Sequence, residues 1–159
     1  MPNITTNVIT LKGIGSDSRF YDMDEDNKKH FDFGTIIPEP KSANECIEKY
    51  GTFYLDSVDE NGHSLKNLMH NDNDTWFDWY SWHREFWGTK WNAMCTEIID
   101  DDNVKFETAW NAPEPVFAAL SRMFPDTDVV VHSEYETGEI CDSVYRDGKV
   151  ISSEMTEVS

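Results

Sequence analysis

The chain has 159 residues, which suits one domain with a real hydrophobic core. Hydrophobic residues make up 38% and aromatic residues 13% of it, and this apolar content excludes disorder of the whole chain. The net charge of −18, from 31 acidic and 13 basic residues, excludes binding to nucleic acid through a basic groove and to anionic lipid, because the protein's own field repels both.

The compartment is predicted from the absence of two signals. No apolar run approaches the roughly 20 residues that a membrane span needs, and residues 1–12 show no secretory signal. Three widely spaced cysteines, Cys46, Cys95 and Cys141, indicate reduced thiols in the core, not a disulfide framework. We therefore expect a protein of the cytoplasm, in the cytosol of a host cell, with no membrane partner.

The first half of the chain contains one clear strand. Residues 3–11 are rich in β-branched residues and end at Gly13. A long insertion then covers residues 16–73. It is predicted to contain a short helix or polar loop over 16–29, an extended stretch over 35–40, a brief helix over 42–50 and a long loop over 52–73.

A Trp-rich helix is predicted next. Asp74 or Thr75 is a suitable N-cap, and Gly88 is a suitable end. The apolar positions between them follow one helical stripe: Trp76, Trp79, Tyr80, His83, Phe86 and Trp87.

The remaining elements alternate between strands and one helix. Residues 91–99 and 104–110 read as a hairpin around three aspartates. Pro113 and Pro115 suit the first turn of a helix that ends at Pro125. Its stripe is Val116, Phe117, Leu120, Met123 and Phe124. Strands are predicted over 128–136 and 140–146, with Asp147-Gly148 as a tight turn before residues 149–152.

This order predicts an α+β fold with the ferredoxin-like split β-α-β-β-α-β pattern. We expect an antiparallel sheet with both helices on one face, a long insertion after the first strand and a C-terminal hairpin. A single domain would span residues 1–152, with residues 153–159 as a polar, frayed tail.

Several motifs carry a resemblance to a known family. They are Phe31-Asp32-Phe33 with Ile36-Ile37-Pro38-Glu39-Pro40, Trp79-Tyr80-Ser81-Trp82 with Trp87-Gly88-Thr89-Lys90-Trp91-Asn92-Ala93, and Phe106-Glu107-Thr108-Ala109-Trp110-Asn111-Ala112-Pro113 with Leu120-Ser121 and Phe124-Pro125. Together they resemble the YubB-type ferredoxin-like proteins of plasmids and bacteriophages, a family without a characterised function. The resemblance implies the fold and a mobile-element origin, but no active site.

Candidate catalytic groups are weak. His83 lies in a sequence without the second histidine of a HExxH zinc motif, and we expect it to be a hydrogen-bonded histidine in the core or at its boundary. The other histidines lack ligand-like spacing to one another or to a cysteine. Gly13-Ile14-Gly15-Ser16 lacks the lysine of a phosphate loop and reads as a plain turn. The sequence therefore predicts no catalytic residue, no cofactor and no metal, and a protein that is not an enzyme.

The acidic residues spread along the chain are the remaining feature that indicates a function. Rows of carboxylates can imitate phosphates to a DNA-binding protein. The candidate partner-binding surface consists of Asp72, Asp74, Asp78, Asp100, Asp101, Asp102, Asp126, Asp128, Glu134, Glu136, Glu139 and Asp142.

The leading functional hypothesis follows from this charge and from the resemblance. It is a phage or plasmid protein that binds, and inhibits or modulates, a host protein with a basic, nucleic-acid-binding surface, for example in a defence system. The first alternative is an interaction or assembly module in which acidity serves solubility. The second is an uncharacterised enzyme. Salt separates the first two, because only electrostatic binding weakens steeply as the salt concentration rises.

Overall fold

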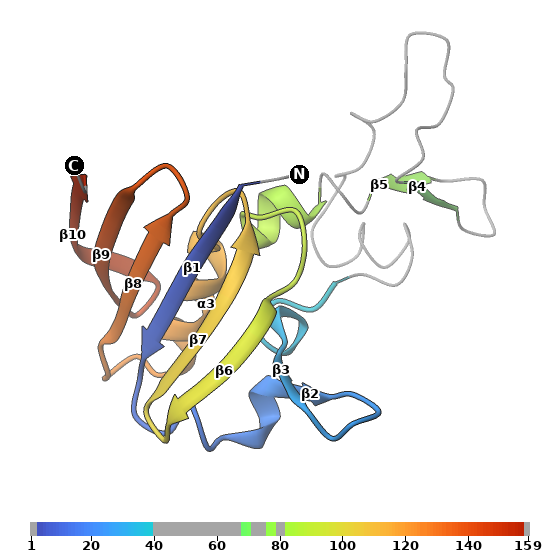
Figure 1. Ribbon diagram of the computed structural model, residues 1–159, viewed down its shortest axis with the longest axis horizontal. Helices are drawn as coiled ribbons and strands as arrows, with labels where there is room; N and C mark the ends of the chain where they lie inside the picture. The colour runs from blue at the N-terminus through green and yellow to red at the C-terminus, as the bar shows by residue number, and fades with distance from the viewer. Residues whose placement is uncertain (1–2, 40–67, 71–75, 79–81, 158–159) are drawn as a thin grey trace, which may run out of the picture.

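The computed structural model describes residues 3–39, 68–70, 76–78 and 82–157. Its main element is a six-stranded antiparallel sheet in the order β10-β9-β8-β1-β7-β6 (Figure 1). The strands are β1 (Ile4–Thr10), β6 (Met94–Asp100), β7 (Asn103–Ala109), β8 (Val129–Tyr135), β9 (Glu139–Arg146) and β10 (Lys149–Glu157). The part from β8 to β6 has the β-α-β-β-α-β connectivity of a ferredoxin-like fold, which confirms the predicted α+β class.

β1 occupies the middle of the sheet, between β7 and β8 (Figure 1). Its residues alternate between the two faces, as a half-buried strand requires. Thr5, Asn7 and Ile9 are buried, whereas Thr6 and Val8 are half-buried on the opposite face. The sheet therefore has one buried face and one open face.

The helices pack on the buried face. α3 (Glu114–Met123) begins after Pro113 and buries Val116, Phe117 and Leu120 of the predicted stripe, whereas Met123 of that stripe is exposed. Figure 1 shows α3 behind the sheet, where it contacts η4 (His83–Trp87), a short π-helical segment. No described helix covers the other face.

The predicted helix over residues 74–87 is wrong in its first part. Trp76–Asp78 forms β5, which pairs with β4 (Leu68–His70), and helical backbone is described only from Trp82 to Trp87. Aromatic residues favour strands as well as an apolar helix stripe, so a pairing partner decides between the two. The predicted cap positions and Trp79 and Tyr80 lie outside the described residues.

Gly88 ends this helical segment, as predicted. It adopts a left-handed conformation with φ +78°, and its amide donates a hydrogen bond to the carbonyl oxygen of His83. A Cβ atom there would lie 2.7 Å from Cδ of Pro115, so the position also requires the small residue for packing against α3. The Thr89 hydroxyl then donates to the Ala109 carbonyl at 2.6 Å and fixes the approach to β6.

The insertion after β1 contains more regular structure than predicted. Residues 16–39 form η1 (Ser18–Phe20), β2 (Tyr21–Met23), β3 (Lys29–Phe31) and η2 (Phe33–Thr35). β2 and β3 pair as a small hairpin beside β6 (Figure 1). The brief helix predicted over 42–50 lies outside the described residues, and β4 lies within the segment predicted as a long loop.

Aromatic rings join this hairpin to the sheet. The ring of Phe31 stacks on Phe106 of β7 at 5.0 Å, and Phe33 meets Phe106 edge-on at 5.6 Å. Phe33 also meets Trp87 of η4 at 5.7 Å. All four side chains are at most 2% exposed. The motif at residues 31–33 is therefore part of the core.

The C-terminal hairpin is longer than predicted. Asp147 and Gly148 have φ values of +48° and +81° and form the expected tight turn. β10 then pairs with β9 as far as Glu157, opposite Glu139. The prediction of a frayed tail from Ser153 is thus wrong. Its polar composition reflects an exposed edge strand, which can pair through its backbone without burying side chains.

Two of the cysteines differ from the predicted core thiols. Cys95 is exposed, in the bulged part of β6 where its own φ is +51°. Cys141 is half-buried in β9, near the edge of the sheet. Both are free thiols, whereas Cys46 lies outside the described residues.

Candidate functional site

The open face of the sheet gathers polar side chains from all six strands. Strand pairing aligns one row of neighbouring residues across this face. From β10 to β6 the row consists of Glu154, Asp142, His132, Val8, Lys105 and Glu97. Acidic side chains therefore lie at both ends of the row, and groups able to carry positive charge lie inside it.

The middle of this face is hollowed. A shallow depression of about 520 Å³ is lined by Thr6, Val8, Glu97, Ile98, Ile99, Lys105, His132 and Glu134. Its walls combine aliphatic side chains with both signs of charge. Nothing in this lining is a nucleophile adjacent to a base, so the depression is suited to contact with another molecule more than to covalent chemistry.

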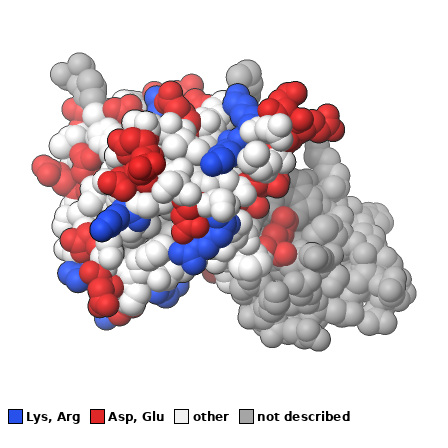
Figure 2. Space-filling view, turned by 90° about the horizontal axis from the view of Figure 1, so that it is seen from below, with Lys and Arg blue, Asp and Glu red and all other residues white. Residues whose placement is uncertain are grey.

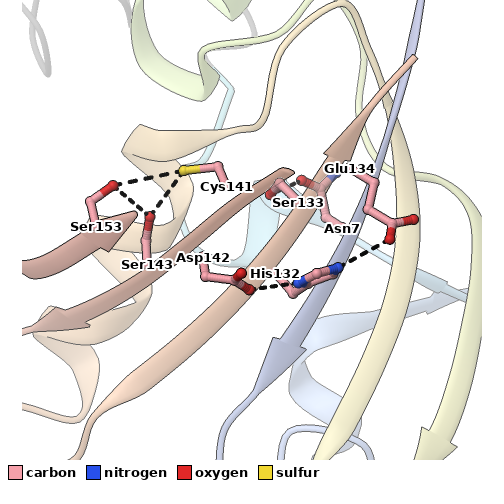
Figure 3. A network of polar contacts seen from close by, with 8 residues as sticks. All are labelled: Asn7, His132, Ser133, Glu134, Cys141, Asp142, Ser143 and Ser153. Carbon is pink, nitrogen blue, oxygen red and sulfur yellow. Dashed lines mark hydrogen bonds and ion pairs between the residues drawn. The ribbon is translucent and has the colours of Figure 1, made fainter. Parts of the chain in front are cut away.

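His132 lies between two carboxylates on this face (Figure 3). Its Nδ1 atom is 2.6 Å from the Asp142 carboxylate and its Nε2 atom is 3.2 Å from the Glu134 carboxylate. These contacts, above all the hydrogen bond to Asp142, raise the pKa of His132 above 6.5, whereas its partial burial acts in the opposite direction. The protonated imidazole is thus favoured in the folded protein.

The raised pKa predicts how stability depends on pH. Protonated His132 stabilises the fold fully below its unfolded pKa of about 6.5. This contribution is lost as the pH rises through the higher folded-state pKa. We expect the difference in unfolding free energy between wild type and His132→Gln to shrink as the pH is raised from about 5.5 to 8.5, in urea titrations at each pH.

The control for this prediction is Asp142→Asn, which removes the main cause of the shift. In that variant the imidazole pKa, followed by NMR, should fall back toward its ordinary value. A stability difference that grows with pH would contradict the assignment. The nearest basic side chain in the row, Lys105, is separated from His132 by β1 and remains unchanged in both variants.

A second polar network lies on the buried face and is structural. Asn7 donates from Nδ2 to the Thr108 hydroxyl at 3.0 Å and accepts from the Ser133 hydroxyl at 2.7 Å. It joins β1 to both of its neighbours with every side-chain group paired, as burial requires. Nearer the edge, Cys141, Ser143 and Ser153 form a chain of hydroxyl and thiol contacts between β9 and β10 (Figure 3).

His83 lies at the boundary of the hydrophobic core and its ring nitrogens are hydrogen-bonded, as expected. Its ring is stacked on Trp87 at 4.2 Å. Its nitrogens lie 2.7 Å from the Lys90 carbonyl oxygen and 2.8 Å from the Glu39 carboxylate. Within the described ranges, no three or more His, Cys, Asp or Glu residues are arranged to hold a metal ion, and no helix is long and apolar enough to cross a membrane.

The structure distributes the described part of the predicted acidic surface over four places. Asp100, Asp101 and Asp102 lie at the β6–β7 turn, at the same end of the sheet as the α3–β8 loop with Asp126 and Asp128. Glu136 and Glu139 lie at the opposite end, at the β8–β9 turn. Glu134 and Asp142 lie on the open face. Asp78 belongs to β5, while Asp72 and Asp74 lie outside the described residues.

The end with the aspartates is of mixed charge. Figure 2 looks onto this end from below and shows basic side chains between groups of acidic ones. Asp102 accepts a hydrogen bond from the Gly13 amide at 2.9 Å, and Asp128 lies 3.7 Å from Arg146. The Asp100 carboxylate accepts from Asn103 and Asp102, which lowers its pKa. These aspartates thus have local structural roles.

Acidic side chains predominate on β8, β9 and β10, where His132 lies on the open face and Arg146 and Lys149 lie at the β9–β10 turn. Residues 129–145 of β8 and β9 and residues 150–157 of β10 contain no Lys or Arg. They contribute six carboxylates, which we call the acidic strand patch: Glu134, Glu136, Glu139, Asp142, Glu154 and Glu157. Glu154 and Glu157 were not part of the predicted acidic surface, because a frayed tail was predicted from residue 153 onward.

Comparison with known proteins supports the fold. Residues 86–159, just under half of the chain, match the family described as a ferredoxin-like domain in Api92-like protein. The match begins inside η4 and includes every strand of the main sheet except β1. No curated protein and no solved structure shows a significant match to the chain.

Proposed function

We propose that this protein binds the basic, nucleic-acid-binding surface of a host protein through the acidic strand patch. The observation that carries the proposal is the patch itself: residues 129–145 and 150–157 of three neighbouring strands hold six carboxylates and no Lys or Arg, in a chain of net charge −18. Of these six, Asp142 and Glu154 stand opposite each other on the open face, and Glu134 lies on the same face. Such a surface attracts a basic partner at long range and speeds the encounter.

The geometry of the patch suits a phosphate-binding partner. Neighbouring strands lie about 4.8 Å apart, and alternate residues of one strand lie about 7 Å apart. Carboxylates on such a grid offer Arg and Lys side chains repeated partners at short range. Because Arg binds carboxylate and phosphate with the same planar pair of donors, a surface built for one anion accepts the other.

The resemblance of the sequence motifs to YubB-type proteins supports a proposal about the wider setting. We propose that the chain originates from a plasmid or bacteriophage and acts in the cytosol of the host cell. A host defence protein that must hold DNA or RNA would then be the natural target. Occupying its basic surface inhibits it by competition, and no catalysis by the bound protein is required.

The test compares two variants of equal net charge. The patch variant carries Glu134→Gln, Glu139→Gln, Asp142→Asn and Glu154→Gln. The matched control carries Glu25→Gln, Asp26→Asn, Glu85→Gln and Asp101→Asn, at exposed positions outside the patch. Each protein is immobilised and exposed to host lysate at low salt, and bound proteins are eluted with a salt gradient.

We expect wild type and control to retain a nucleic-acid-binding protein that DNA displaces. The patch variant should bind this protein at least about tenfold more weakly, since each exposed ion pair contributes up to about 1 kcal/mol and 1.4 kcal/mol is a factor of ten. Equal weakening by both variants would show a general charge effect. Binding that persists at high salt would contradict the electrostatic proposal.

A further inference from the structure

β10 forms one edge of the sheet, and no described strand pairs with its outer side (Figure 1). All nine of its residues are exposed. Every second residue of such an edge strand presents a backbone N–H and C=O pair to solvent, which is a template for another extended segment. Val150, Ile151 and Met155 add apolar side chains that are 53%, 55% and 56% exposed.

The other edge of the sheet is protected. β6 contains two register shifts, and Cys95 within it has a positive φ, so its backbone is irregular. β3 contacts β6, and the amide of Phe31 donates to the Thr96 hydroxyl at 3.0 Å. The two edges therefore differ, and only β10 offers a long accessible strand among the described residues.

Charge indicates what β10 can accept. Glu154 stands directly opposite Asp142 of β9, and Glu157 stands opposite Glu139. Like charges at directly opposite positions destabilise a strand pair. Of these four carboxylates, only Asp142 has an ion-pair partner among the described residues, which is His132. A cation from outside would relieve this repulsion.

We propose that β10 pairs with an extended, basic segment of the partner protein, which adds a seventh strand to the sheet. This inference rests on the proposed function and assigns the recognition to one edge of the acidic strand patch. Glu154 belongs to the open face, whereas Met155 and Glu157 belong to the face that carries α3. The complementary segment therefore alternates Lys or Arg on the open face with aliphatic residues on the other.

A second copy of this chain fits the edge less well. Two copies bring together net charges of −18 and the glutamates of both β10 strands. The bulge between Val150 and Ser152 further disturbs regular pairing of one β10 with another. A basic segment that pairs with residues 152–157 meets neither charge repulsion nor the bulge, because β10 pairs regularly with β9 over these residues.

The probe is a synthetic heptapeptide, acetyl-Lys-Val-Lys-Val-Lys-Val-Lys-amide. Its control has the same sequence and charge, but N-methyl groups on alternate backbone nitrogens remove the donors of one edge. Binding to the full chain is measured by calorimetry at low and moderate salt. Hydrogen exchange with mass spectrometry follows the amides of residues 149–157, with β1 as an internal reference that is already paired on both sides.

We expect the unmethylated peptide to bind at least about tenfold more tightly than the methylated one. It should slow exchange in β10 but not in β1. The double variant Asp142→Asn, Glu154→Gln removes two neighbouring carboxylates of the open face and, once checked for folding by circular dichroism, should weaken binding several-fold. The variant Glu25→Gln, Asp26→Asn, with the same net charge, should leave binding unchanged.

Two results would overturn strand addition and leave the proposed function standing. One is equal binding of both peptides without slower exchange in β10, which would place the cations on the patch surface alone. The other is a dimer by light scattering whose β10 amides are protected without peptide, which would make a second copy the occupant. Both proposals would be overturned if no nucleic-acid-binding protein were retained from the lysate and the peptide did not change hydrogen exchange in β10.

Discussion

Replacing Phe106 with alanine is expected to lower the free energy of unfolding by about 3–5 kcal/mol. The Phe106 side chain is fully buried, and the rings of Phe31 and Phe33 lie within 6 Å of it, at 5.0 and 5.6 Å between centroids. Its removal leaves a cavity between the sheet and the β2–β3 hairpin. Urea or thermal unfolding measures the loss, which should lower Tm by on the order of 10 °C.

The matched control is Val150→Ala. Val150 is 53% exposed on β10, so its truncation should change stability by less than about 0.5 kcal/mol. A double-mutant cycle with Phe31→Ala then measures the coupling across the stacked pair. We expect the two losses to be non-additive by about 0.5–3 kcal/mol. Additive losses would show that the hairpin does not depend on this contact.

Gly15→Ala is expected to destabilise the fold by about 3 kcal/mol, because a Cβ atom at residue 15 would overlap the carbonyl oxygen of Asp100. The loop after β1 lies directly against the β6–β7 turn, and the Gly15 amide donates to the Asp101 carbonyl at 2.8 Å. The backbone on both sides is held by hydrogen bonds, so neither segment can move away cheaply. Chemical denaturation measures the change.

Gly13→Ala separates this steric effect from backbone strain. Gly13 has φ +83° but open space around its Cα atom, so alanine there should cost only about 1 kcal/mol. A larger loss at Gly13 than at Gly15 would contradict the argument. The sequence presented these two glycines as one turn, and only the tertiary contact distinguishes their roles.

The strands could be predicted because their sequence patterns match their environments. β8 alternates Val129 and Val131 toward the core with exposed Val130, and β1 is rich in β-branched residues. The register of β8 and β9 was also within reach, since a short turn around Gly138 sets it and so places His132 opposite Asp142. The position of His132 and Asp142 relative to Lys105 could not be predicted from the sequence. It depends on β1, which lies between strands that are distant from it in sequence.

Two errors have a common physical origin. The aromatic run from Trp76 satisfies a helical stripe, yet its first residues pair as a strand with Leu68–His70. The segment after Ser152 looks too polar for a strand, yet it pairs with β9 as far as Glu157. In both places the backbone partner decided the structure, and side-chain periodicity does not report that partner. The acidic surface predicted from the sequence lacked Glu154 and Glu157 for the same reason.

The central position of β1 has a consequence for how the protein assembles during synthesis. Ile4 pairs with Ala109, so β1 leaves the ribosome about 100 residues before the first of its two partners. The β6–β7 and β8–β9–β10 units are linked by short turns and can each form as soon as they are made. β1 can pair with β7 once residues 103–109 have been made, which closes a long loop at an entropic cost, and β8 can then add to its other side. β1 therefore has to wait for β7 and then for β8, and until each of them is made a nascent chain exposes an unpaired edge of this strand.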